Sequence, residues 1–525
     1  MIDIKSAVSM ALYVLGAVSA TSMAADRSSV QTQTRQLVIQ FEDSDVRRVQ
    51  SARRHQVMPD IVLPDGGSVE FLRRFDSNGA VVQLPRSVSL EEAQRIADQL
   101  ASRPGIAAVV PDKRFFPALV PNDPSYPPGA NAVLDPGQWH LFEDTAGIRM
   151  PAAWDRSSGN PTGVVAVLDT GIIPHRDLDG ARVLPGYDFF SDIALDNDGT
   201  PGRDSDPSDP GDATVDDECG AGIAGEDSSW HGLSIAGVIA AQSDNNLDIA
   251  GIDFEARLLP VRVLGKCGGD LSDVADAIRW AVGLSVAGAP FNPNPANVIN
   301  LSLSGTGPCT TVEQDAINAA VSRGAVVVVA AGNEGGNVSN VSPANCDNVI
   351  VAGAIARDGK LASYVNTGAN IDITAPGGDD PDPPDPVNNP PNGVLTLSNL
   401  GTTVPAGDAL AVIQGTSFTA AQVSGVVSLM FSIDSSLSPN VIENLLKATA
   451  RAFPDASCNT SLCGAGILDA DAALAGAEDP SGTLGNGFNT GGGGGCALTR
   501  TGGAVPDPVL LLALAGLWRL RRTRG

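Results

Sequence analysis

The chain has 525 residues, of which 43% are hydrophobic, and it carries a formal net charge of −27 at pH 7. This length exceeds one ordinary domain, and the apolar share suffices for a sizeable core. Such a negative surface repels phosphate backbones, which excludes nucleic-acid binding as the main function. It is typical of an exported protein or of one that binds cations.

The N-terminal segment has the parts of a secretory signal peptide. Lys5 precedes an apolar stretch over residues 7–18, and Ser22-Met23-Ala24 supplies small residues around a cleavage point near Ala24 or Ala25. The stretch is too short to cross a bilayer as a stable helix. We therefore expect residues 1–25 to be removed on export, the alternative being a buried N-terminal helix.

A small α+β unit is expected over residues 26–117. Leu37, Ile39 and Phe41 stand at alternate positions, as on one face of a strand. Ser89 and Glu92 form a capping-box pattern at the start of a helix with one apolar face. Residues 106–110 then indicate another strand.

After a turn-rich linker at residues 120–129, short apolar strands alternate with helical patterns up to about residue 475. The expected strands are 164–168, 258–263, 298–303, 325–330 and 349–351, and the expected helices include 271–282, 312–322 and 417–431. Strands that are apolar on both faces belong to a parallel sheet with helices on each side. We therefore predict a three-layer α/β domain over residues 118–475.

The C-terminal region has a different character. A glycine-rich linker is expected over residues 476–495, followed by Cys496, a ten-residue apolar run at 509–518 and four arginines within 519–524. The run is short for a spanning helix, which needs about 20 residues. Residues 496–525 nevertheless resemble the sorting tails of some bacterial surface proteins, which implies transient membrane association and cleavage near the glycine–cysteine junction. A weakly inserting appendage is the alternative.

Export makes disulfides plausible for the seven cysteines. Six of them precede residue 464, and many connectivities are open to six cysteines. The sequential pairing is favoured here, with Cys496 left over: Cys219–Cys267, Cys309–Cys346 and Cys458–Cys463. A zinc site is the competing interpretation, but neither a CxxC motif nor a histidine pair accompanies these cysteines.

Three segments carry residues suited to nucleophilic catalysis. Asp169 ends an apolar strand before a glycine turn, His231 starts an apolar helix, and Ser417 follows a tight turn and opens another helix. The carboxyl ends of parallel strands are where sites form in such sheets. A serine hydroxyl needs a neutral imidazole to take its proton, and a carboxylate orients that imidazole.

A fourth element strengthens this interpretation. Asn333 follows a valine-rich strand and begins a Glu-Gly-Gly turn. Its amide can donate to the oxyanion of a tetrahedral intermediate, with the backbone N–H of Ser417 as second donor. Each element alone is most often an ordinary loop residue, but four in this order favour an active site.

With these motifs, residues 120–475 resemble the subtilase family of serine peptidases, whose members have the chain order aspartate, histidine, serine. The resemblance implies a subtilisin-like catalytic domain, a secreted endopeptidase, and an inhibitory pro-domain over residues 26–117. In the family's histidine motif, a threonine and a second histidine follow the glycine after the catalytic histidine. In this chain, Leu233 and Ser234 stand at those two positions. Residues 418–422 differ from the family's sequence after the serine, which affects the expected pocket shape and rate.

The resemblance also implies a substrate-binding cleft. Ser302, Leu303 and Ser304 correspond to the strand along which an extended peptide binds. Ala331 and Gly332 correspond to the opposite wall of the S1 cleft. This cleft receives the side chain of the substrate residue that precedes the cleaved bond. Protein or peptide substrates are the expected partners of a monomeric enzyme.

Calcium is the expected cofactor. Residues 188–218 hold eleven acidic side chains and one basic one, Arg203. Carboxylates at alternating positions of a glycine-rich loop suit Ca²⁺ better than zinc, and the candidate ligands are Asp196, Asp198, Asp204 and Asp206, with Asp177 for a second site. The spacing is not that of an EF-hand, and a solvated acidic loop is the alternative.

Two other function classes remain to be compared. One is a carboxyl peptidase of the sedolisin type, which has glutamate in place of histidine and an acidic pH optimum. The other is a calcium-binding surface adhesin built on an inactive protease scaffold. His231 in its motif argues against the first, and the complete set of triad residues argues against the second.

Overall fold

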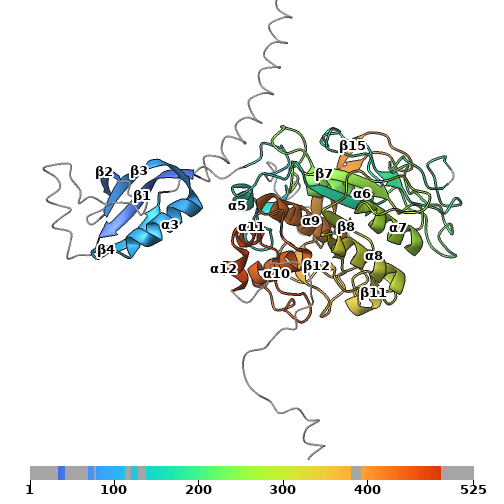
Figure 1. The fold of residues 1–525 in the computed structure, drawn as a ribbon. Coiled ribbons are helices and arrows are strands. Elements are labelled where there is room, and N and C mark those ends of the chain that lie inside the picture. The colour runs from blue at the N-terminus through green and yellow to red at the C-terminus, as the bar shows by residue number, and fades with distance from the viewer. Residues whose placement is uncertain are drawn as a thin grey trace, which may run out of the picture. The chain divides into compact units, whose positions relative to one another are not determined.

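The computed structural model describes residues 33–41, 69–75, 79–112, 120–127, 137–200, 202–379 and 392–485. They form an N-terminal body ending at residue 112 and a larger body from residue 120 to residue 485 (Figure 1). The predicted signal peptide, the glycine tract, Cys496 and the predicted tail lie outside the described residues.

The N-terminal body is a four-stranded antiparallel sheet with one helix. Its elements are β1 (Gln33–Phe41), β2 (Glu70–Phe75), β3 (Gly79–Ser89), α3 (Leu90–Ala101) and β4 (Ile106–Pro111). The strand order is β2-β3-β1-β4. Leu37 of β1 and Ala93 of α3 belong to one buried core. Ser89 caps α3 by accepting the N–H of Glu92 at 3.1 Å, as the sequence pattern predicts.

The larger body is built on a seven-stranded parallel sheet of order β13-β12-β10-β8-β5-β7-β6. Its strands are β5 (Val164–Asp169), β6 (Tyr187–Asp188), β7 (Arg257–Arg262), β8 (Val298–Leu301), β10 (Val326–Ala330), β12 (Ile350–Ile355) and β13 (Ile373–Pro376). Nearly every residue of these strands is buried, which explains their continuous apolar sequences.

Helices cover both faces of this sheet. The helices of this body are α4 (Trp139–Phe142), α5 (Met150–Trp154), α6 (His231–Ala240), α7 (Leu271–Ala281), α8 (Thr311–Ser322), η3 (Val338–Asn340), α9 (Thr416–Ile433), α10 (Pro439–Thr449), α11 (Ala470–Glu478) and α12 (Pro480–Leu484). Alternate residues of β5 face opposite cores. Val165 packs with α6 and α9, whereas Ala166 packs with α7 and α8. The predicted three-layer α/β class is confirmed.

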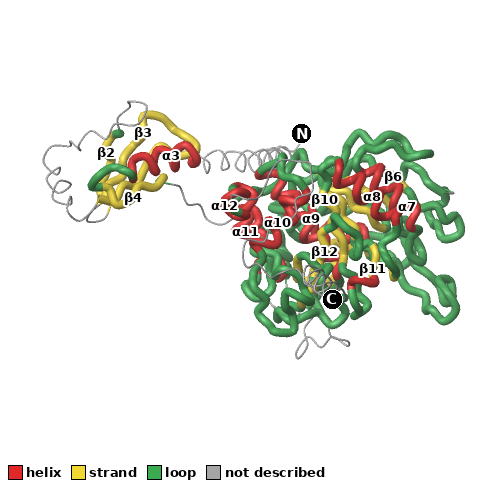
Figure 2. The backbone as a smooth tube through the Cα atoms, turned by 60° about the horizontal axis from the view of Figure 1, so that its bottom comes forward, coloured by secondary structure: helices red, strands yellow, loops and turns green. Residues whose placement is uncertain are grey.

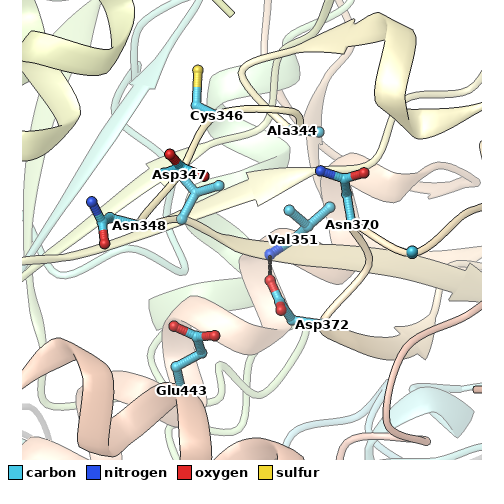
Figure 3. A pocket seen from close by; sticks show the side chains of 10 residues that line it. Ala344, Cys346, Asp347, Asn348, Val351, Asn370, Asp372 and Glu443 are labelled. Carbon is cyan, nitrogen blue, oxygen red and sulfur yellow. Dashed lines mark hydrogen bonds between the residues drawn. The ribbon is translucent and has the colours of Figure 1, made fainter. Parts of the chain in front are cut away.

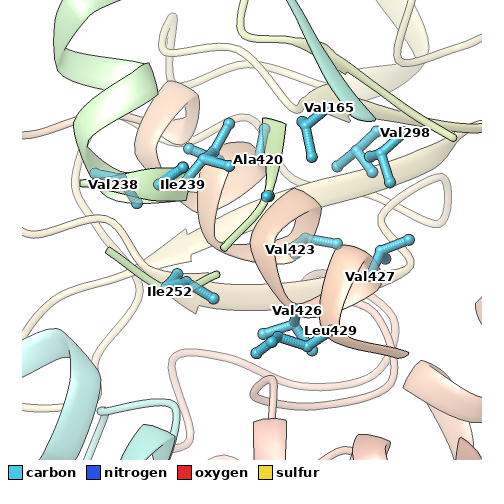
Figure 4. Packing of buried hydrophobic residues seen from close by; sticks show 14 of the residues in the cluster. Val165, Val238, Ile239, Ile252, Val298, Ala420, Val423, Val426, Val427 and Leu429 are labelled. Atoms are coloured by element: carbon cyan, nitrogen blue, oxygen red, sulfur yellow. The ribbon is translucent and has the colours of Figure 1, made fainter. Parts of the chain in front are cut away.

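Close-up views show how these layers pack. Side chains of α9 lie between the sheet residues Val165 and Val298 and the α6 residues Val238 and Ile239 (Figure 4). On the other face, α7 and α8 lie side by side (Figure 2). Burial of this apolar area supplies the main favourable free energy of folding.

The helix α9 is also the one described helix that is long and apolar enough to span a membrane. Almost the whole of it is buried inside the larger body, against both the sheet and α6. It is therefore the central helix of the core, and its apolar composition reflects that burial.

An antiparallel hairpin, β14 (Val394–Asn399) and β15 (Asp408–Ile413), packs on α6. The hydroxyl of Ser234 donates to the carbonyl of Leu397 at 2.8 Å. The indole N–H of Trp230 donates to a carbonyl of the hairpin loop at 2.7 Å. The hairpin, which the sequence analysis did not predict, thus fixes the turn that leads into α6. A second short pair joins β9 (Gly305–Thr306) to β11 (Val341–Ser342).

Three disulfides are present in the larger body. They join Cys219 to Cys267, Cys309 to Cys346 and Cys458 to Cys463. The favoured sequential pairing is confirmed for all six of these cysteines.

The larger body continues past residue 475, after which the sequence predicts a glycine-rich linker. Helix α11 ends at Glu478, and α12 follows directly and contacts α10. Helix α11 in turn packs on α9. The buried residues of α11, among them Ala473, Leu474 and Ala477, lie on one face of the helix, whereas α12 has no buried residue.

Candidate active site

The structure brings Asp169 and His231 together at the carboxyl end of β5. Asp169 is the last residue of β5, and His231 is the first residue of α6. The distance from His231 Nδ1 to Asp169 Oδ1 is 2.7 Å, and the Asp169 side chain is completely buried. The same Asp169 oxygen accepts the N–H of Thr170 at 2.8 Å. A carboxylate in this position selects the imidazole tautomer that has its proton on Nδ1.

Ser417 lies in the first turn of α9 and is mostly buried. Its hydroxyl donates to the carbonyl of Ser302 at 3.3 Å, and the hydroxyl of Ser302 donates back to the carbonyl of Ser417 at 2.8 Å. Among the described residues no hydrogen bond joins Ser417 to His231. The next residue, Phe418, nevertheless places its ring centroid 6.0 Å from that of His231. Ser417 and His231 therefore belong to one site.

Asn333 follows the end of β10 and contacts the turn that precedes Ser417. Its side-chain carbonyl oxygen accepts both the N–H and the hydroxyl of Thr416, each at 2.9 Å. Because both bonds use the oxygen, the amide NH₂ of Asn333 is oriented as the donor beside the start of α9. This orientation suits a group that binds a developing negative charge.

The predicted substrate-binding residues flank Ser417 on two sides. Ser302 contacts Ser417 directly, whereas Ser304 is exposed. On the other side the N–H of Gly332 donates to the hydroxyl of Thr416 at 3.1 Å. Thr416, which the sequence analysis did not single out, therefore ties the β10 end to the nucleophile turn. Leu303, which follows Ser302, is half-buried, and Ala331, which precedes Gly332, is buried.

The charges around His231 favour its protonated form. Burial lowers the pKa of the imidazole, but Asp169, together with Asp212 and Asp209, has the larger combined effect and raises that pKa above its ordinary value of 6.5. Asp212 accepts both the N–H and the hydroxyl of Ser229, two residues before His231, at 2.7 Å. The imidazole is thus a stronger base than in a free peptide.

The acidic loop forms a cluster around a buried arginine. Nη1 of Arg262 donates to Asp188 and, at 2.9 Å, to Asp196, and lies 3.9 Å from Asp198. One oxygen each of Asp196 and Asp198 is buried and has no hydrogen-bond partner. Three carboxylates against one guanidinium leave a net charge of about −2 in a buried place. Asp188 was not among the predicted ligands.

The other two predicted ligands of the loop are less well placed. The backbone of Asp204 pairs with that of Asp188, but its carboxylate accepts the N–H of Asp206 at 2.7 Å. The carboxylate of Asp206 accepts the N–H of Ser208 at 3.1 Å, and Asp206 is exposed. Both carboxylates therefore stabilise turns of their own loop.

Asp177 lies in a second acidic cluster. It is fully buried, and its carboxylate accepts the side-chain amide of Asn245 at 2.7 Å and the N–H of Ile249 at 3.0 Å. Asp123, which is also buried, accepts the N–H groups of Asp244 and Asn245. Burial raises the pKa of Asp177 to about 7 and that of Asp123 to about 6. Among the described side chains no cation forms an ion pair with Asp177 or Asp123, although Arg176, which pairs with Asp248, interacts electrostatically with Asp177.

A cavity of about 440 Å³ opens elsewhere in the larger body and includes Asp347, Asp372 and Glu443 in its lining (Figure 3). Asp372 accepts the N–H of Val351 at 2.8 Å. The ammonium group of Lys447 lies 2.5 Å from Asp372 and 2.6 Å from Glu443. None of the predicted catalytic residues lines this cavity, so it is not the catalytic cleft.

Comparison with known proteins identifies the family. The profile of the subtilase family matches residues 162–483. An extracellular protease of Xanthomonas campestris pv. campestris is 46% identical over 404 residues, which cover 77% of this chain and 65% of that protein. An extracellular basic protease of Dichelobacter nodosus is 36% identical over 417 residues, covering 78% and 64%. The match thus spans less than two thirds of either relative.

A solved protease structure from Pseudoalteromonas arctica is 46% identical in sequence, with a TM-score of 0.63. The similarity covers 68% of this chain and all of that one. The matched residues include β5, α6 and α9, which carry the Asp169–His231 pair and Ser417. This chain belongs to the subtilase family.

Proposed function

We propose that the protein is a secreted serine endopeptidase in which Asp169, His231 and Ser417 form the catalytic triad. The observation that carries this proposal is the 2.7 Å contact between His231 Nδ1 and the buried Asp169 carboxylate, next to the turn that bears Ser417. The names of the two bacterial relatives support an extracellular protease. A predicted signal peptide agrees with export.

The proposed reaction is acyl transfer. Nε2 of neutral His231 takes the hydroxyl proton of Ser417 as Oγ attacks the peptide carbonyl carbon, and the carbonyl electron pair moves to its oxygen. Collapse of this intermediate expels the amine, to which His231 returns the proton. Water then attacks the acyl-enzyme by the same steps and releases the acid. Asp169 orients His231 and stabilises its charged form throughout.

Two donors are proposed to hold the oxyanion, the amide NH₂ of Asn333 and the backbone N–H of Ser417. The hydrogen bonds from Thr416 to Asn333 support this role, because they fix the amide before substrate arrives. The helix dipole of α9 adds a favourable potential at its N-terminus. No reorganisation is then needed when the negative charge develops.

The substrate is proposed to bind as an extended strand along Ser302–Ser304, with Ala331 and Gly332 as the opposite wall. The contacts of Ser302 with Ser417 and of Gly332 with Thr416 support this arrangement, because they place both walls against the nucleophile turn. Backbone hydrogen bonding of this kind tolerates many sequences. It fits an enzyme that cleaves proteins.

The N-terminal body is proposed to be the inhibitory pro-domain. Its four-stranded sheet and helix form a core separate from that of the larger body, and it precedes the proposed catalytic domain in the chain. We propose that the enzyme itself removes this body by cleavage at residues 116–120, which lie mostly outside the described residues. Residues 121–127 belong to the larger body, in which the N–H of Ser125 donates to the carbonyl of Asp248 at 2.9 Å.

Structural calcium is proposed at the two acidic clusters. Around Asp188, Asp196 and Asp198, a net charge near −2 and two buried oxygens without partners fit a divalent cation with oxygen ligands. Asp177 and Asp123 would hold a second ion, because both carboxylates are buried near each other and contact Asn245. Calcium would supply only charge compensation and rigidity at these positions.

Labelling with a fluorophosphonate tests the proposed function directly. A serine activated by a histidine reacts with this reagent, whereas an inactive scaffold does not. We expect stoichiometric modification of the purified mature protein, with mass spectrometry locating it on Ser417. Absence of labelling together with failure to cleave a peptide library would favour the adhesin. Activity confined to acidic pH would favour the carboxyl-peptidase mechanism.

The charge of Asp212 is expected to shift the pH dependence of hydrolysis. His231 acts as a base only when it is neutral. We therefore expect kcat/KM to be highest above the pKa of His231 and to fall as the pH falls through that pKa. Since that pKa is raised above 6.5, the acid limb should lie above pH 6.5. Asp212→Asn should move this limb toward lower pH by a few tenths of a pH unit, as expected for a partly solvated charge.

Asp434→Asn is the matched control for this measurement, because it removes one carboxylate at the far end of α9. Its pH profile should superimpose on that of the unmodified protein. Equal shifts in both variants would assign the effect to total charge and would contradict a specific role of Asp212.

Removal of calcium is expected to lower the melting temperature. A ligand that binds only the folded state stabilises it by mass action, by about 3 kcal/mol at a hundredfold excess over Kd. For a body of roughly 350 residues, with an unfolding entropy of about 2.1 cal/mol/K per residue, this corresponds to a fall of roughly 4 °C for each site that chelation empties. Thermal unfolding of a Ser417→Ala variant, which prevents autolysis, measures it with and without added calcium.

The two proposed sites can be separated by substitution. Asp196→Asn and Asp177→Asn should each remove part of the calcium-dependent increase in melting temperature, and Asp206→Asn should leave it intact. Magnesium serves as the control ion. An unchanged melting temperature on chelation would contradict calcium binding. Both clusters would then be solvated or internally compensated charges.

A further inference from the structure

Asp209 is a buried carboxylate close to the Asp169–His231 pair, and its charge is one of those that raise the pKa of His231. Only 1% of its surface is exposed. One carboxylate oxygen accepts the hydroxyl of Thr170 at 2.6 Å, and the other accepts the N–H of Gly211 at 2.8 Å. Hydroxyl–carboxylate bonds of this length are among the stronger hydrogen bonds in proteins. Burial raises the pKa of Asp209 to about 7, and the hydrogen bonds from Thr170 and Gly211 oppose this shift.

Thr170 connects this carboxylate to both members of the pair. Its N–H donates to the Asp169 oxygen that also contacts His231, at 2.8 Å. Its hydroxyl oxygen accepts the N–H of Gly232, the residue after His231, at 3.0 Å. A hydroxyl has one proton. Because that proton is given to Asp209, the oxygen lone pairs are directed toward Gly232.

The three segments meet with no space between their backbones. A Cβ atom on Gly232 would lie 2.1 Å from the carbonyl oxygen of Gly171, which follows Thr170. A Cβ atom on Gly171 would lie 2.6 Å from the carbonyl oxygen of Pro207. The N–H of Ile172 donates to that same Pro207 oxygen at 3.2 Å. The end of β5, the start of α6 and the loop 207–211 therefore form one packed unit.

We propose that Asp209 is a positioning residue, which acts through the Thr170 hydroxyl to hold the start of α6, and with it His231, at a fixed distance from Asp169. The inference rests on the proposed peptidase function. Asp209 itself touches neither substrate nor the reacting atoms. It locks the rotation of the Thr170 hydroxyl, and that hydroxyl joins the strand end to the helix start.

This arrangement predicts an effect on kcat with little effect on KM. A displacement of about 1 Å in a catalytic group can cost on the order of 10² in rate. Among the described residues, no hydrogen bond joins Asp209 or Thr170 to the proposed substrate walls at 302–304 and 331–332. Loss of the hydroxyl link should therefore weaken proton transfer and leave substrate binding nearly unchanged.

The test measures kcat and KM of the mature enzyme, with active sites counted by fluorophosphonate titration. Thr170→Val keeps the side-chain shape and removes the hydroxyl, and it should lower kcat per titrated site by about tenfold to a hundredfold. Thr170→Ser keeps the hydroxyl and should restore most of this loss. Asp209→Ala should resemble Thr170→Val, and KM should stay within about twofold throughout.

Asp253 provides a matched control at the other end of α6. Its side chain is completely buried and accepts the hydroxyl of Ser428, also at 2.6 Å, while its N–H donates to the carbonyl of Ile239 at 2.9 Å. Ser428→Ala removes an equivalent hydroxyl–carboxylate bond far from His231. It should lower the melting temperature and leave kcat per titrated site unchanged.

Each result decides between positioning and simple structural support. Unchanged kcat per titrated site in Thr170→Val, with only a lower melting temperature, would overturn the inference. If Thr170→Val does not fold, Asp209→Ala, which removes the acceptor and leaves Thr170 in place, carries the same test. Failure of the unmodified protein to react with the fluorophosphonate would instead refute the proposed function itself.

Discussion

Ser417→Ala is expected to abolish peptide hydrolysis while leaving the fold intact. The loss of kcat should be on the order of 10⁶-fold, the magnitude known for removing the nucleophile of subtilisin. The residual rate would come from the oxyanion donors and substrate binding alone. The fold should persist because the hydroxyl makes only a 3.3 Å hydrogen bond to Ser302, whereas the rest of α9 is held by apolar packing.

Ser424→Ala is a matched control on the same helix. The Ser424 hydroxyl is buried and donates to the side-chain oxygen of Asn300 at 2.9 Å, so its loss should cost about 1 kcal/mol of stability. Its kcat should stay within a few-fold of the unmodified enzyme. Hydrolysis by Ser417→Ala at a comparable rate would refute the triad.

The Ser417→Ala variant also tests how the N-terminal body is removed. If the enzyme removes its own N-terminal body, Ser417→Ala should accumulate the unprocessed chain, whereas Ser424→Ala should be processed normally. Gel mobility and N-terminal sequencing of the secreted proteins distinguish the two forms. Equal processing of both variants would show that another protease performs the cleavage.

Where local sequence determines structure, the sequence predictions agree with the molecule. The strand before Asp169 was predicted because residues 164–168 are apolar throughout, and such a segment is stable only when both faces are covered. Ser89 was predicted to cap a helix because a side-chain oxygen can satisfy a free N–H of the first turn. In both cases the determining interactions lie within a few residues of chain.

Interactions between distant segments were not predictable in this way. Asp188 joins Asp196 only because Arg262, on the neighbouring strand, draws both carboxylates to one guanidinium. Asp123 meets Asp177 through a third segment that contains Asn245. Nothing in the sequence around any of these residues indicates its partner, so Asp188 and Asp123 were not among the predicted ligands.

The hairpin β14–β15 escaped prediction for a different reason. The residues of β15 are only half-buried, and the connection between the strands is eight residues long and exposes Leu400 and Val404. Neither a strict alternation of apolar and polar residues nor a two-residue turn marks it. Its place is set by packing against α6, through the hydrogen bond between Ser234 and Leu397.

Asn333→Asp is expected to lower kcat by on the order of 10²–10³, the magnitude known for the corresponding donor in subtilisin. Aspartate keeps an oxygen that can accept the N–H and hydroxyl of Thr416, so the turn before Ser417 should retain its geometry. It removes the NH₂ donor and places a negative charge beside the developing oxyanion. KM should change little, because the donor acts mainly in the transition state.

Thr416→Ser and Thr416→Val complete the test of Asn333. Serine keeps the hydroxyl that links Asn333 to Gly332, and its kcat should approach that of the unmodified enzyme. Valine removes the link and frees the Asn333 amide to rotate, so an intermediate loss of kcat is expected. When Asn333→Asp is combined with Thr416→Val, the losses should be less than additive, because both act through one amide group. Full activity of Asn333→Asp would show that the oxyanion is held by other donors.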